Sequence, residues 1–101
     1  MNTTDITMVR IYLTESQRLL DILLKRLHDE ERVMGVTVFR GISGFGKSGK
    51  IPVASLLDLS LNLPLVVEFF DTPQRVNVIL DDLQDILESG HVVTWSASMK
   101  A

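Results

Sequence analysis

The residues best suited to chemistry lie in one stretch, Arg40–Lys50, with the sequence RGISGFGKSGK. It contains four of the six glycines and three of the ten basic residues of the chain, so backbone amides and cationic side chains are concentrated there. Glycine lets a backbone approach a ligand closely, and free amides beside cations form an anion-binding nest. The stretch therefore predicts either a site for a phosphate or other anion, or a mobile hairpin tip without a ligand.

In the anion-site interpretation, the glycines offer backbone donors, the basic residues offer charge and a serine offers a hydroxyl. The candidate ligand-binding residues are Arg40, Gly41, Ser43, Gly44, Gly46, Lys47, Ser48 and Lys50.

Residues 41–48 also match the phosphate-binding P-loop pattern G-x-x-x-x-G-K-[ST]. A P-loop needs a helix that begins at the lysine and directs its N-terminus at the phosphates. Gly49 and Pro52 follow immediately and argue against that helix. The strand-like run 66–71, which ends in Asp71, resembles a Walker B strand, yet the parallel βα repeats of such nucleotidases are missing. A chance match is the better interpretation.

Other chemically capable groups form no evident constellation. His28 and His91 have no metal-ligand spacing, so no metal site is predicted. A set of carboxylates is expected on the solvated side of the second helix: Asp81, Asp82, Asp85 and Glu88. No catalytic residue is predicted, and an enzyme or metal-handling protein is the least favoured function.

The elements that position these residues follow from hydrophobic periodicity. Strands are expected at residues 6–13, 36–40, 65–71 and 91–99. Thr14-Glu15-Ser16-Gln17 has the capping-box form and predicts a helix from Thr14 to about Arg32, with Gly35 ending the turn. Thr72-Pro73 predicts a second helix, followed by Gly90 at its C-terminal end. The conformation of 51–63 is left open.

The resulting order is β-α-β-β-α-β, the ferredoxin-like plan of the α+β class. We expect one domain over residues 1–101, with a four-stranded antiparallel sheet, two helices on one face and a mobile Gly-rich loop at about 41–54. The other face is expected to carry Arg10, Tyr12, Glu68, Phe70 and Thr94. This set is too apolar for a sheet face that contacts only solvent, so we predict that it is buried against copies of the chain in a homotrimer. Arg10 and Glu68 are expected to form a structural salt bridge there.

Composition limits the remaining functions. A net charge of −3 and a pI near 5.2 give no support for nucleic-acid binding. The chain has no cysteine, no signal-peptide pattern at its N-terminus and no apolar run long enough for a membrane span. These features predict a cytoplasmic protein without direct membrane insertion.

Several segments together resemble the uncharacterised family known as domain of unknown function one-ninety, which is similar in fold to the PII (GlnB-like) signalling proteins. They are Arg40-Gly41-Ile42, Gly44-Phe45-Gly46, Leu59-Ser60, Leu63–Glu68, Asp71 and Gly90–Thr94. The resemblance implies a ferredoxin-like trimer in which the connection between the second and third strands corresponds to the mobile T-loop of PII proteins. It further implies an adenine nucleotide between subunits at the loop base, and a transporter, channel or enzyme contacted by the loop.

Two departures from the PII pattern stand out. The place of the Gly- and Lys-rich loop before the last strand is taken by Glu88-Ser89-Gly90-His91, and residues 41–63 contain no tyrosine that could be modified. The leading hypothesis is a PII-like regulatory trimer with no certain cofactor and a small anionic ligand. The alternative is a scaffold trimer that binds protein partners without any small molecule.

Overall fold

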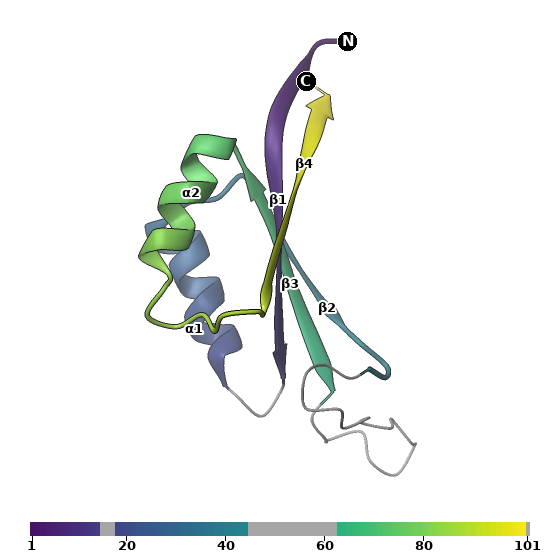
Figure 1. Ribbon diagram of the computed structural model, residues 1–101, viewed down its shortest axis with the longest axis vertical. Coiled ribbons are helices and arrows are strands. Elements are labelled where there is room, and N and C mark those ends of the chain that lie inside the picture. The colour runs from purple at the N-terminus through teal and green to yellow at the C-terminus, as the bar shows by residue number, and fades with distance from the viewer. Residues whose placement is uncertain (15–17, 45–62, 101) are drawn as a thin grey trace.

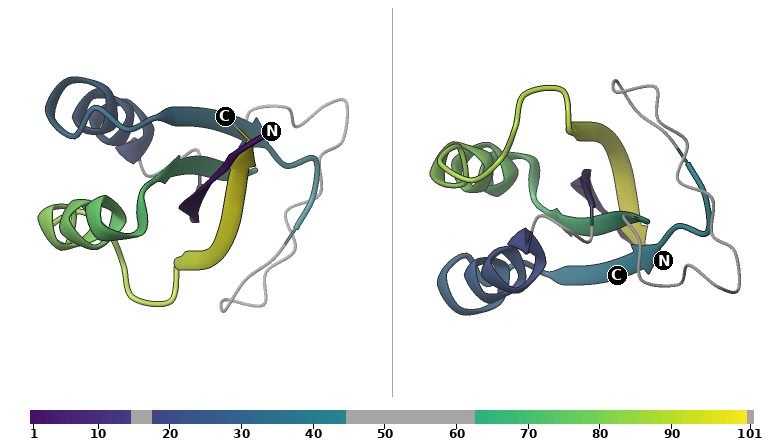
Figure 2. Two further views of the ribbon diagram at one scale, coloured as in Figure 1. Left: turned by 90° about the horizontal axis from the view of Figure 1, so that it is seen from above. Right: turned by 90° about the horizontal axis from the view of Figure 1, so that it is seen from below.

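The structure is a computed structural model that describes residues 1–14, 18–44 and 63–100. Its strands are β1 (Thr3–Thr14), β2 (Gly35–Arg40), β3 (Pro64–Asp71) and β4 (Val92–Lys100). The helical elements are α1 (Leu19–Lys25), the π-helical turn η2 (Arg26–Glu30) and α2 (Pro73–Asp82). The strands form one antiparallel sheet in the order β2-β3-β1-β4, and both helices cover one face of it (Figures 1 and 2). This confirms the predicted α+β, ferredoxin-like βαββαβ fold.

Alternation along the two central strands produces the core. Inward-facing side chains of β1 and β3, such as Val9, Ile11, Val67 and Phe69, are fully buried. They pack against an apolar stripe from the helices that comprises Leu23, Leu27, Val76, Ile79 and Leu83. Burial of each such side chain contributes about 1.5–3 kcal/mol to folding. The core therefore lies between the helices and one face of the sheet, and the opposite face has no cover from the described residues.

The first helix begins later than its sequence predicts. Thr14 is the last residue of β1 and pairs with Pro64 of β3. Helix α1 begins at Leu19, after Arg18 in a left-handed conformation and without a side-chain cap. The predicted start of a continuous helix at Thr14 is therefore wrong, and residues 15–17 of the capping box lie outside the described residues.

The first helical segment ends close to the predicted Arg32, but the residue that terminates it differs from the prediction. The π-turn η2 ends at Glu30, and the chain leaves the helix through Arg32 at φ 52°, the conformation that glycine normally supplies at this place. The amide of Val33 then donates to the carbonyl of Leu27 at 3.2 Å. Gly35, expected to end the turn, is instead the first residue of β2.

The second helix starts as predicted. Thr72 is its N-cap, and the hydroxyl accepts the amide of Arg75 at 3.3 Å while Pro73 occupies the first helical position. Its end comes early, because regular helix stops at Asp82 although the apolar spacing continues to Leu87. Gly90 takes a positive φ of 83°, but in the connection to β4 rather than directly after the helix.

Candidate functional site

The base of the β2–β3 connection is closed by one close approach. The amide of Gly41 donates to the carbonyl of Pro64 at 2.8 Å, directly beyond the last ladder pair, Arg40 with Leu65. A methyl group at Gly41 would lie only 2.6 Å from Cγ of Pro64, whereas one at Gly44 would lie at an ordinary 3.4 Å from the same atom. Gly41 is thus required by its close approach to the ring of Pro64 rather than by a positive φ.

Four of the predicted ligand-binding residues lie at this loop base: Arg40, Gly41, Ser43 and Gly44. Arg40 and Ser43 are exposed, and Ile42 between them is 82% exposed. The other four predicted residues, Gly46, Lys47, Ser48 and Lys50, lie outside the described residues. The described part of the site is therefore a short exposed corner at the end of edge strand β2.

The uncovered sheet face carries an ion pair at its centre. Arg10 of β1 donates to Oε2 of Glu68 on β3 from Nη2 at 2.7 Å and from Nε at 3.1 Å, which confirms the predicted salt bridge. The guanidinium also lies 5.3 Å from the ring centroid of Trp95, within cation–π range. Hydrogen bonding to the Glu68 carboxylate, and after it to Tyr12, raises the pKa of Arg10 above its ordinary value.

Strand register defines the rest of this face, because directly opposed residues of an antiparallel pair point to the same side. Arg10 lies opposite both Glu68 and Val93, and Met8 lies opposite both Phe70 and Trp95. We call the set on this side the open face: Ile6, Met8, Arg10, Tyr12, Gly35, Thr37, Phe39, Val66, Glu68, Phe70, Val93, Trp95 and Ala97. Four of its large apolar side chains are 39–50% exposed, namely Tyr12, Phe39, Val93 and Trp95.

Thr94 does not belong to the open face, so that prediction is wrong. It lies opposite Val9, whose side chain is fully buried on the helix-covered side of the sheet. The β4 residues that share the face with Arg10 are its neighbours Val93 and Trp95. Their alternation with Thr94 was visible in the sequence, but which of the two sets faced outward was not.

Phe70 closes a gap on the open face. Gly35 of β2 lies opposite it, and a methyl group at Gly35 would come within 2.6 Å of the ring atom Cε1. The aromatic ring thus covers the bare glycine backbone at the start of edge strand β2.

The connection from α2 to β4, residues 83–91, lies at the edge of the sheet opposite to β2. Its last residue, His91, accepts the amide of Tyr12 at 2.9 Å through its carbonyl, and its ring Nδ1 lies 3.3 Å from the carbonyl of Tyr12. An open depression of about 390 Å³ runs beside the connection, lined by Leu80, Asp81, Gln84, Leu87, Glu88, Ser89, Gly90 and Val92. Its charged lining residues are acidic.

Metal binding and membrane insertion find no support in the described part of the chain. His28 lies 2.7 Å from its neighbour Asp29, and His91 lies 3.6 Å from Glu88. Residues 1–14, 18–44 and 63–100 contain no group of three or more histidine or acidic side chains that could hold a metal ion. No helix within these ranges is long and apolar enough to cross a bilayer.

A family model described as "Uncharacterized ACR, COG1993", the DUF190 family, matches residues 6–99. The chain belongs to this family. A relative in Methanocaldococcus jannaschii, the UPF0166 protein MJ1524, is 27% identical over 89 residues, which are 84% of this chain and 82% of the relative.

Solved structures show that this DUF190 chain has a PII-like fold. CPII from Thiomonas intermedia K12, a nitrogen regulatory PII-like protein bound to ADP, AMP and bicarbonate, superposes with a TM-score of 0.68 at 17% identity, covering 100% of this chain and 99% of that one. The PII-like signalling protein TTHA0516 from Thermus thermophilus gives 0.62 at 16% identity, covering 98% and 91%. At these identities the likeness shows the fold alone.

Proposed function

We propose that this DUF190 protein is a PII-like regulatory homotrimer that binds an adenine nucleotide between subunits at the base of the β2–β3 connection. The observation that carries this proposal is the open face. Tyr12, Phe39, Val93 and Trp95 are 39–50% exposed beside the Arg10–Glu68 pair, and no described element covers them. Contiguous apolar surface of this kind marks a surface that another molecule covers, and a second copy of the chain is the simplest one.

The loop base and the 83–91 connection are placed so that each could form half of a site between two subunits, and this supports a closed ring. The loop base at Arg40 and the start of β4 at Val92 lie at the same end of the sheet, since Arg40 pairs with Leu65, Leu65 with Leu13, and Val92 with Ile11 (Figure 1). They lie on opposite edges of the sheet, however, because the strand order is β2-β3-β1-β4. In a cyclic trimer each interface joins two different surfaces. One subunit's loop base would then meet its neighbour's 83–91 connection.

The residues at the loop base and in the connection beyond it indicate which chemical groups the ligand would carry. Gly41 and Gly44 would provide close backbone approach, Ser43 or Ser48 a hydroxyl, and Arg40, Lys47 and Lys50 positive charge, with Gly46 as a further backbone donor. CPII, which shares the fold, was solved with ADP and AMP, and this supports an adenine nucleotide as the ligand. Binding would change the conformation of the β2–β3 connection and its fit to a transporter, channel or enzyme.

The alternative function is a scaffold trimer that binds protein partners through the same connection without a nucleotide. One observation favours it. The 83–91 connection contains Asp85 and Glu88 but no lysine or arginine, so its charge opposes a phosphate. Pull-downs that depend on residues 41–54 and are unchanged by added nucleotide would support this alternative.

Two measurements test the proposal. Sedimentation at working concentration is expected to give three times the chain mass of 11.3 kDa, and a lone 11.3 kDa particle would overturn the trimer. Calorimetry with ATP, ADP, AMP and cyclic nucleotides is expected to give heat with the wild type and much less with Lys47→Ala/Lys50→Ala. A trimer that gives no heat with any of them would refute the nucleotide and leave the scaffold.

A further inference from the structure

Helix α2 stops although its side-chain pattern continues. Apolar residues recur at helical spacing through the connection that follows the helix, at Leu83, Ile86 and Leu87. In a continued α-helix the carbonyl of Asp82 would accept the amide of Ile86. Instead the amide of Ile86 donates to the carbonyl of Leu83 at 3.0 Å, in a tighter turn. The carbonyl of Asp82 is thereby released from the helix.

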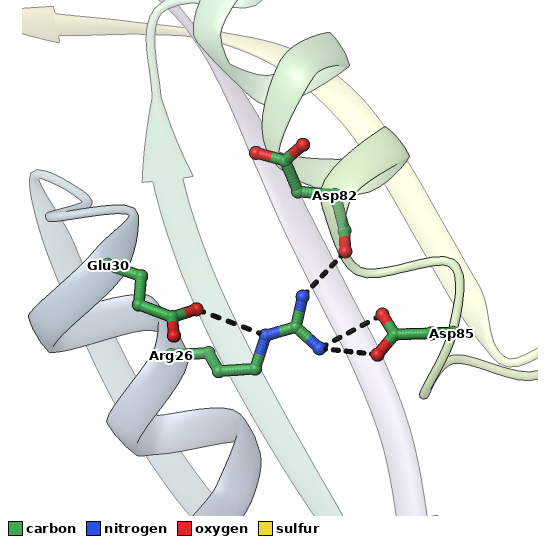
Figure 3. Close-up of polar contacts among 4 residues, drawn as sticks. All are labelled: Arg26, Glu30, Asp82 and Asp85. Carbon is green, nitrogen blue, oxygen red and sulfur yellow. Dashed lines mark hydrogen bonds and ion pairs between the residues drawn. The ribbon is translucent and has the colours of Figure 1, made fainter.

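The carbonyl of Asp82 accepts a hydrogen bond from Arg26 instead. Its Nη2 donates to the carbonyl oxygen of Asp82 at 2.6 Å, and its Nη1 donates to both carboxylate oxygens of Asp85 at 2.9 Å (Figure 3). Nε lies 3.3 Å from Glu30 on its own helical turn. One guanidinium thus joins η2 to the last turn of α2 and to the connection beyond it. Asp85 is exposed, as predicted, but it lies beyond the end of α2 and is a partner in this bridge.

The geometry suits an arginine side chain better than a lysine side chain. Two guanidinium nitrogens meet three oxygens of two kinds, the backbone carbonyl of Asp82 and the two carboxylate oxygens of Asp85. The planar fork of a guanidinium holds its donors in a fixed arrangement that matches these oxygens, whereas a lysine ammonium is a compact point charge. The C-terminal end of a helix also favours positive charge. Hydrogen bonding to Asp85 raises the pKa of Arg26 above its ordinary value.

The bridge fixes the segment that leads into β4. Leu87 and Glu88 of the connection line the depression beside β4, and the connection ends at His91, which is bonded to the backbone of Tyr12. We propose that Arg26 is a positioning residue that holds the 83–91 connection in its turn conformation. The second part of this proposal rests on the proposed function: by holding the connection, Arg26 shapes the half of the inter-subunit ligand site that lies beside β4.

Amide hydrogen exchange tests the first part without any ligand. In Arg26→Gln, the amides of Ile86 and Leu87 are expected to lose protection by about tenfold or more, while amides in β1 and β3 stay unchanged. Lys25→Gln, which removes a neighbouring exposed positive charge, is the matched control and should leave these amides as in the wild type. Unchanged protection in Arg26→Gln would overturn the proposal.

A second variant covers the case in which Arg26→Gln fails to fold. Asp85→Asn changes an exposed carboxylate and keeps the guanidinium on the Asp82 carbonyl, so a smaller loss of protection is expected in the same amides; no loss there would overturn the proposal.

Calorimetry with ADP tests the second part. Arg26→Gln is expected to weaken binding by about tenfold with unchanged sedimentation, and equal affinity would overturn the positioning role. If the wild-type trimer binds no nucleotide, the proposed function fails, and the exchange measurement alone still decides the role of Arg26 in the fold.

Discussion

Gly41 and Pro64 lie in contact across the base of the β2–β3 connection. The amide of Gly41 donates to the carbonyl of Pro64 at 2.8 Å, and the proline ring occupies the space in which any larger residue would place its Cβ. The two ends of the connection are therefore joined by a hydrogen bond that requires glycine on one side. The proposed ligand corner at Arg40, Ser43 and Gly44 takes its position from this contact.

Gly41→Ala is expected to destabilise the protein by about 1–3 kcal/mol, because the new methyl group would lie 2.6 Å from Cγ of Pro64 and the rigid ring cannot yield without a backbone shift. Chemical denaturation measures the change. Gly44→Ala is the control, since its methyl group would make an ordinary 3.4 Å contact, and a shift of less than about 0.5 kcal/mol is expected. Equal effects of the two substitutions would contradict the contact as the cause.

Trp95→Glu is expected to dissociate the proposed trimer into single chains, because a carboxylate would be forced into the open face beside Glu68. Sedimentation velocity measures the outcome. Thr94→Glu places the same charge on the same strand, one residue earlier and on the other side of the sheet, and should leave the assembly intact. Dissociation by both variants, or by neither, would show that the open face is not the subunit interface.

Asp71 is expected to be a structural residue whose replacement by asparagine costs about 1–3 kcal/mol. Its side chain is buried and accepts the amide of Thr72 at 2.8 Å and that of Met34 at 3.3 Å, while Nε of Arg75 lies 3.3 Å away. It therefore ties the end of β3 to the start of α2 and to the segment before β2. Asparagine keeps one acceptor oxygen and loses the charge.

Thermal or denaturant unfolding checks this value for Asp71→Asn. Asp5→Asn, an exposed substitution in β1, is the control and should change stability by less than about 0.5 kcal/mol. A loss in Asp71→Asn no larger than that of the control would contradict the structural role of Asp71.

Local chemistry predicted those elements whose ends are set by neighbouring residues. Thr72-Pro73 predicted the start of α2, because a hydroxyl cap and a proline at the first helical position act within one turn. The same reasoning failed for the first helix, which begins at Leu19 after a left-handed Arg18. Thr14 itself pairs in the sheet with Pro64, fifty residues away. Likewise, Arg26 and Asp85 are 59 positions apart, and periodicity alone could not indicate that their contact accompanies the early end of α2.

The sequence likewise predicted part of the candidate site. Alternation within β1 and β3 placed Arg10 and Glu68 on one face, and their ion pair is present. Thr94 was assigned to the wrong face because the outward side of β4 depends on its register with β1, where Val9 is its partner. That register is a tertiary property, and a shift of one residue exchanges the two faces of a strand.

The last prediction concerns pH and the carboxyl group of Glu31. Partial burial, and after it the neighbouring carboxylate of Asp82, raises the pKa of Glu31 above its ordinary value of 4.5. A carboxyl group whose pKa is higher in the folded state binds its proton more tightly there than in the unfolded chain. Its contribution to stability is therefore greatest below pH 4.5 and declines as the pH rises through the folded-state pKa.

Glu31→Gln removes this unfavourable ionisation. At pH 7 the variant is expected to be more stable than the wild type, by up to about 1 kcal/mol because solvent screens a surface charge, and the advantage should disappear at about pH 4. Denaturant unfolding at both pH values measures the difference. Glu30→Gln, which removes the neighbouring charge that pairs with Arg26, is the control and should give no gain at neutral pH. A Glu31→Gln variant whose advantage is larger in acid than at neutral pH would contradict the raised pKa.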